Sequence, residues 1–159
     1  MKSFEGKGAV SPLGLADKNP KPDVSMKNRS SYSQAVFVTE QTHLPESFVV
    51  VTAYNPNGVK HTHRDNRYFN TQLEAEIKKR LGTGRCFFEI TGQSICGSHK
   101  ELGWGIDCSV AEGLELGALF KQEAIFWINE RRQIYLVDVK TRQKHPIAKT
   151  FEKKLAKPI

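Results

Sequence analysis

His99 and Glu101 are the two side chains in this sequence best suited to acid–base chemistry. One residue separates them, and alternate residues of a β-strand point to the same face, so the imidazole and the carboxylate are expected side by side. A carboxylate beside an imidazole is a general acid–base arrangement, and we predict these two as candidate catalytic residues. The alternative is a hydrogen-bonded pair that braces a loop, because no GxSxG elbow or matched cysteine–histidine signature accompanies them.

Neutral hydrogen-bonding side chains form a second group of candidates, placed at the ends of the expected elements. The predicted ligand-binding residues are Tyr54, Asn55, Asn66, Asn70 and Gln122. The first four have a structural alternative: the stretch Tyr54 to Gly58 has the composition of a turn, and the two helical asparagines could be buried and bonded to a neighbouring loop.

A metal site would need His61 and His63, with Cys96, His99 and Glu101 as further ligands. An HxH pair without a second fixed pair is more typical of a loop leading into a helix, so we predict no metal, although the roles of His61 and His63 stay open. Glycine fingerprints for phosphate loops and dinucleotides are absent, and we predict no cofactor.

The cysteine count indicates a reducing compartment. Cys86, Cys96 and Cys108 make an odd number without a CxxC pair, which favours reduced thiols and a cytoplasmic location over a disulfide scaffold. Cys86 and Cys108 occupy apolar strand positions and are expected in the core. No apolar run approaches the roughly 20 residues that span a bilayer, so no membrane partner is expected.

The elements that must position these residues follow from hydrophobic periodicity. Strands are expected at 35–38, 47–54, 85–91, 101–108, 123–129 and 133–139, with helices at 62–81 and 109–121. Thr62 and Ser109 are the expected helix caps. In the strand from 101 to 108, Gly103 and Gly105 leave one face open.

Strand, helix, strand, strand, helix, strand is the order of the ferredoxin-like plait, here with one appended strand, so the predicted class is α+β. In that topology the candidate residues gather at one end of the sheet, beside a helix amino terminus suited to an anion. The expected organisation is an irregular basic arm at 1–31, one α+β domain at 32–139 and a Lys-rich tail at 140–159.

The basic charge is concentrated in the two expected tails. The chain of 159 residues has a net charge of +7, of which 1–31 contribute +3, 140–159 contribute +6 and 32–139 contribute −2. Solvated basic ends confer solubility, and the alternative is that they bind nucleic acid without sequence preference.

A resemblance rests on Thr52-Ala-Tyr-Asn-Pro56 after an apolar strand, then Asn66, Gly92 and Glu101, and Phe120-Lys-Gln-Glu-Ala-Ile-Phe-Trp127. Over residues 47–139 the chain resembles an uncharacterised bacterial family of unknown function (DUF3293-like). The resemblance implies a domain and a residue set but no reaction.

These observations predict a cytoplasmic module that binds a small polar or nucleotide-like ligand at the end of the sheet where the candidate residues gather. Two other functions stay open. The chain could associate with nucleic acid through its tails, or it could bind a protein partner by extending its sheet at an edge strand, 133–139.

Overall fold

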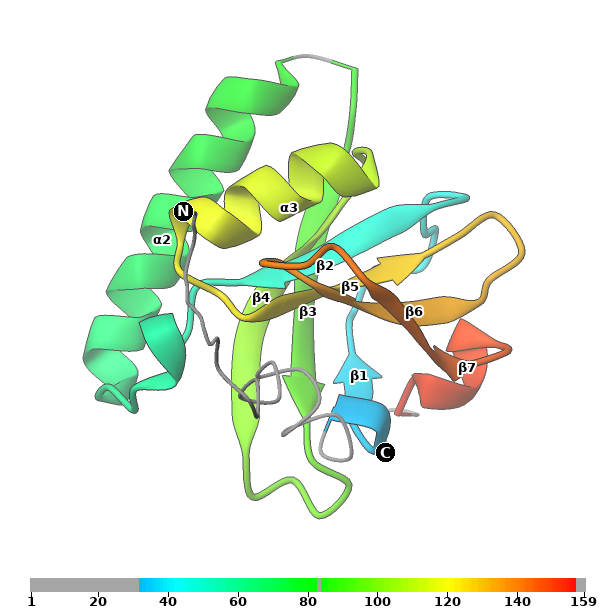
Figure 1. Cartoon of the computed structure of the whole chain (residues 1–159), viewed down its shortest axis with the longest axis horizontal. Helices are drawn as coiled ribbons and strands as arrows, with labels where there is room; N and C mark the ends of the chain where they lie inside the picture. Colours follow the sequence, from blue (N-terminus) through cyan, green and yellow to red (C-terminus); the bar gives the residue numbers. More distant parts are fainter. Residues whose placement is uncertain (1–31, 83, 157–159) are drawn as a thin grey trace, which may run out of the picture.

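The computed structural model describes residues 32–82 and 84–156 (Figure 1). It contains two long helices, seven strands and two short 3-10 helices. The elements are β1 (Val36–Val38), β2 (Phe48–Thr52), η1 (Pro56–Gly58), α2 (His63–Leu81), β3 (Phe87–Gln93), β4 (Lys100–Ile106), α3 (Val110–Leu119), β5 (Ala124–Ile128), β6 (Ile134–Asp138), β7 (Lys144–Ala148) and η2 (Phe151–Lys154).

All seven strands form one curled antiparallel sheet in the order β1-β3-β4-β2-β5-β6-β7. The prediction of a mixed α and β fold is confirmed. The ferredoxin-like plait is not confirmed, because β1, β6 and β7 extend the sheet well beyond four strands. The four strands that carry the predicted site lie together in the middle, in the order β3-β4-β2-β5.

Both helices pack on one face of the sheet. Successive residues of β2 point to opposite faces, and Val49 and Val51 join Leu73, Ile77 and Leu114 in the core beneath the helices. Thr62 accepts the N–H of Asp65, and Ser109 forms a complete capping box with Glu112. Both predicted caps are therefore confirmed.

A second core fills the opposite, concave face of the sheet. Phe37 of β1, Phe48 of β2 and Phe151 of η2 are fully buried there with their rings in contact. After η2 the chain returns to β1, where Leu155 forms a parallel bridge with Phe37. The curl of the sheet thus brings β1 and η2 together over this face, which the helices leave uncovered.

The expected tail at 140–159 is wrong for the part that the structure describes. Residues 144–148 form β7, which pairs with β6, and Phe151 belongs to the second core. For the same reason the strand from 133 to 139 does not lie at an edge, since β6 is paired on both sides. The expected arm at 1–31 lies outside the described residues.

Within the described residues, neither helix is long and apolar enough to cross a bilayer.

Candidate functional site

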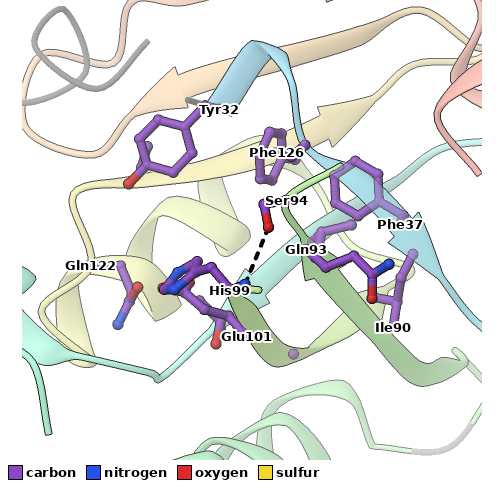
Figure 2. A pocket seen from close by; sticks show the side chains of 15 residues that line it. Tyr32, Phe37, Ile90, Gln93, Ser94, His99, Glu101, Gln122 and Phe126 are labelled. Atoms are coloured by element: carbon purple, nitrogen blue, oxygen red, sulfur yellow. Dashed lines mark hydrogen bonds and ion pairs between the residues drawn. The ribbon is translucent and has the colours of Figure 1, made fainter. Parts of the chain in front are cut away.

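A cavity of about 380 Å³ opens on the concave face, at the end of the sheet where β4 and β5 begin (Figure 2). Its walls come from β1 and the turn before it, β2, β3, β4, β5 and the loop between β3 and β4. The lining residues are Tyr32, Ala35, Phe37, Val50, Thr52, Ile90, Gly92, Gln93, Ser94, His99, Glu101, Gly103, Gln122, Ala124 and Phe126.

Strand alternation and one close backbone approach shape the floor of this cavity. A Cβ atom at Gly103 would lie 2.7 Å from the main-chain oxygen of Val51, so no larger residue fits there without a shift. At Gly105 the space expected to be open is instead filled by the ring of Phe88, 2.2 Å from where a Cβ would stand. The open part of the β4 face is therefore confined to the end that contains Gly103 and Glu101.

His99 and Glu101 both line the cavity and contact each other, with 3.1 Å between His99 Nε2 and Glu101 Oε2. An ionised carboxylate only accepts hydrogen bonds, so Nε2 of the imidazole must carry the proton in this contact. In the neutral imidazole this leaves Nδ1 as an acceptor. The arrangement can hold a histidine in the tautomer of a general base.

Gln122 also lines the cavity, and its orientation is set by two hydrogen bonds. Its Nε2 donates to the main-chain oxygen of Tyr54 at 3.0 Å and to that of Phe120 at 3.2 Å. Both hydrogens of the amide are thereby used, which leaves Oε1 as the polar atom with capacity for a ligand.

Asn55 and Asn66 are brought together by the fold, but in a brace outside the cavity lining. Asn66 Oδ1 accepts the main-chain N–H of Asn55 at 2.8 Å, and its Nδ2 donates to Asn55 Oδ1 at 2.9 Å. Asn55 Oδ1 also accepts the N–H of His61. Asn55 has a left-handed conformation (φ 50°), which asparagine tolerates, so the pair fixes the turn between β2 and α2.

Tyr54 and Asn70 are buried and are likewise absent from the cavity lining. Tyr54 Oη and Asn70 Oδ1 have no hydrogen-bond partner among the described residues. Burial raises the pKa of Tyr54, with Arg67 opposing and Glu101 adding to the effect. The expected convergence of all candidates on one concavity is therefore wrong for the lining of this cavity, which does not include Tyr54, Asn55, Asn66 or Asn70.

The aromatic wall of the cavity was not predicted from the sequence. Figure 2 shows Tyr32, Phe126 and Phe37 along one side, opposite Gln122, His99 and Glu101. Phe126 contacts Phe37 and Tyr32 edge-to-face, with ring centroids 5.0 and 6.0 Å apart. Alternation along β5 places Phe126 on the same face as Ala124, and this was the available signal.

The loop between β3 and β4 holds a thiol with unusual acidity. Ser98 and Ser94 hydrogen-bond to Cys96 Sγ and lower its pKa to about 7. Burial instead raises the pKa of Cys108 to about 12. Cys86 is exposed, so its expected core position is wrong, because it precedes the first residue of β3.

The described residues contain no group of three or more His, Cys, Asp or Glu side chains arranged to hold a metal ion. The ring of His61 packs edge-on against Phe69, and that of His63 packs against Tyr54.

Comparison with known proteins gives one match. No curated protein and no solved structure matches the chain significantly. Residues 51–125 match the family model described as "Protein of unknown function (DUF3293)". This stretch runs from β2 to the start of β5 and includes Thr52, His99, Glu101 and Gln122. The resemblance to this family of unknown function is therefore confirmed over residues 51–125.

Proposed function

We propose that this chain binds a small polar or nucleoside-sized organic molecule in the cavity on the concave face. The observation that carries the proposal is the composition of the cavity wall, which is aromatic and aliphatic on one side and hydrogen-bonding on the other. Ligand sites are typically concave, of about 300 to 1,000 Å³, and mostly apolar with a few placed polar groups. A volume of about 380 Å³ suits a single small molecule.

The ligand-binding set differs from the five residues expected from the sequence. Gln122 contributes its side-chain carbonyl oxygen, and His99 and Glu101 contribute an imidazole and a carboxylate. Asn55 and Asn66 act behind this wall, where they hold the turn before α2. Tyr54 and Asn70 are buried outside the lining, and the main-chain oxygen of Asn70 accepts the indole N–H of Trp104.

Acid–base catalysis on the bound molecule is a second candidate function, favoured by the contact between His99 and Glu101. The carboxylate orients the imidazole so that Nδ1 serves as the base. The His99 side chain is 65% exposed, so solvent reaches the base in the absence of ligand.

Binding of a protein partner at the strand from 133 to 139 is not supported, because this strand, β6, is paired on both sides and has no free edge. Binding of nucleic acid through the basic tails stays a prediction, but fewer lysines of the expected carboxyl-terminal tail are available for it. Lys154 donates to the main-chain oxygen of Ser33, and Lys144 lies over the ring of Trp127. Both lysines belong to folded elements and not to a solvated tail.

A thermal-shift screen of nucleosides, nucleobases and polar metabolites tests the binding proposal. A ligand at about 100 times its Kd stabilises the folded state by about 2.7 kcal/mol. Ala124→Leu places extra bulk in the cavity and should remove every shift seen with the wild type. Ala118→Leu makes the same change at an exposed position on α3 and should preserve the shifts. Shifts that persist in a folded Ala124→Leu variant would place the binding elsewhere.

A further inference from the structure

The charged groups of the described cavity lining are the Glu101 carboxylate and, when it is protonated, the His99 imidazole. None of its 15 lining residues is a lysine or arginine, and Glu101 supplies a carboxylate. The carboxylates of Glu123 and Glu101 both act on the hydroxyl of Tyr32, whose pKa is raised by burial and by these two charges. An anionic group placed here would lose its hydration and meet like charge.

On the polar side of the cavity the fold uses the donor hydrogens of Gln122, Thr52 and His99. Gln93 and Tyr32 also line the cavity and carry donor groups. Both amide hydrogens of Gln122 go to main-chain oxygens. The Thr52 hydroxyl donates to the main-chain oxygen of Leu102 at 2.6 Å. The Nε2 proton of His99 points to Glu101. Gln122 Oε1, His99 Nδ1 and the Glu101 carboxylate remain as acceptors for a ligand.

The opposite wall adds aromatic rings. Phe126, Phe37 and Tyr32 line the cavity, and the negative faces of aromatic rings attract cations. The composition of the site therefore favours a ligand with an apolar or planar part joined to a positively charged group that donates hydrogen bonds.

We propose that the ligand is a small organic cation, a protonated amine or an amidinium, whose N–H groups bind Glu101, Gln122 and His99 while its body packs on Phe126 and Phe37. This inference rests on the binding function proposed above and narrows it. It assigns no part of the cavity to a phosphate, so a nucleotide-like ligand would bind through its base.

Three probes of nearly equal shape test the charge preference: benzamidine, neutral benzamide and anionic benzoate. Binding is followed by protein NMR at the Ala124 methyl and the Phe126 ring in the wild type. We expect benzamidine to bind at least about tenfold more tightly than benzamide, because a hydrogen bond to a charged partner is stronger than a neutral one, and benzoate not to bind.

Glu101→Gln should lower the benzamidine affinity about tenfold and change the benzamide affinity less than about twofold. Glu130→Gln removes the same charge from an exposed position at the other end of β5 and should change neither. Equal affinities for benzamidine and benzamide, or tighter binding of benzoate, would overturn the cation assignment but leave the cavity as a binding site. If no probe shifts Ala124 or Phe126, both the cation assignment and the proposed function fail.

Discussion

Gln122 and Tyr54 are 68 positions apart, and the side-chain amide of the first donates to the main-chain oxygen of the second at 3.0 Å. This bond joins the start of β5 to the residue that precedes the Asn55–Asn66 brace. The brace is therefore connected through this bond to the polar wall of the cavity, although Asn55 and Asn66 do not line it.

Gln122→Ala should cost about 1 kcal/mol of unfolding free energy, the usual contribution of such a hydrogen bond. The measurement is urea denaturation monitored by tryptophan fluorescence. Gln143→Ala, an exposed change of the same type, should stay within about 0.5 kcal/mol. An unchanged midpoint for Gln122→Ala would mean that the link to Tyr54 contributes nothing to stability.

Asn66→Ala should be more costly, about 2 kcal/mol, because it leaves the half-buried main-chain N–H of Asn55 without its acceptor and removes one of the two donors to Asn55 Oδ1. Gln72→Ala, on the exposed side of α2, is the control. The ligand affinity of folded Asn66→Ala protein should change little, and a large loss of affinity at intact stability would restore Asn66 as a ligand-contacting residue.

The salt bridge between Arg85 and Glu112 should make the free energy of unfolding depend on pH in the acidic range. Arg85 and the N-cap N–H of Ser109 lower the pKa of Glu112 from 4.5 to about 2. A carboxyl group whose pKa is lower in the folded state stabilises that state when the pH is above the pKa of the unfolded chain. This stabilisation is lost as the pH falls toward the pKa of the folded state.

The difference in urea midpoint between the wild type and Glu112→Gln should thus be constant above about pH 5 and shrink toward pH 3. Glutamine at this position can still complete the capping box, so the difference isolates the charge. A difference that grows on acidification would contradict the assignment.

Cys96 should be the cysteine that reacts most readily with iodoacetamide near neutral pH. With its pKa at about 7, half of the thiol is ionised there, whereas Cys108, at about 12, remains protonated. Mass spectrometry of tryptic peptides gives the rate at each site from pH 5 to 9. Ser98→Ala should move the midpoint of the Cys96 profile upward, because Ser98 is the largest cause of the shift.

Phe151→Ala should cost about 3 to 5 kcal/mol, as for a large buried aromatic residue. The corresponding change at an exposed, flexible tail would have almost no effect, so thermal denaturation separates the folded segment found here from the expected tail. Lys153→Ala, exposed in the same 3-10 helix, is the matched control.

Local signals in the sequence were sufficient for most of the elements. The cap at Thr62 and the stripe of Leu73, Ile77 and Leu81 predict α2 almost to the residue. Strand directions alone place Glu101 and Gln122 at the same end of the sheet, and both line the cavity.

Long-range features were not predictable in this way. Lys144 and Pro146 argue against a strand at 144–148, yet proline is tolerated on an edge strand, and β7 is one. The aromatic wall depends on the curl that brings β1 over the concave face, and no local period in the sequence encodes that curl. Asparagine patterns likewise do not distinguish a brace from a binding site, because the difference lies in which partner each amide meets.

The bridge between Phe37 and Leu155, with the N–H of Ala156 donating to the main-chain oxygen of Phe37, has a consequence for synthesis on the ribosome. Strand β1 is translated before the other strands but gains part of its support from one of the last described segments. A nascent chain that has emerged only as far as β6 lacks Phe151 and Leu155, so the first-made wall of the cavity stays incompletely supported until residue 155 has emerged as well.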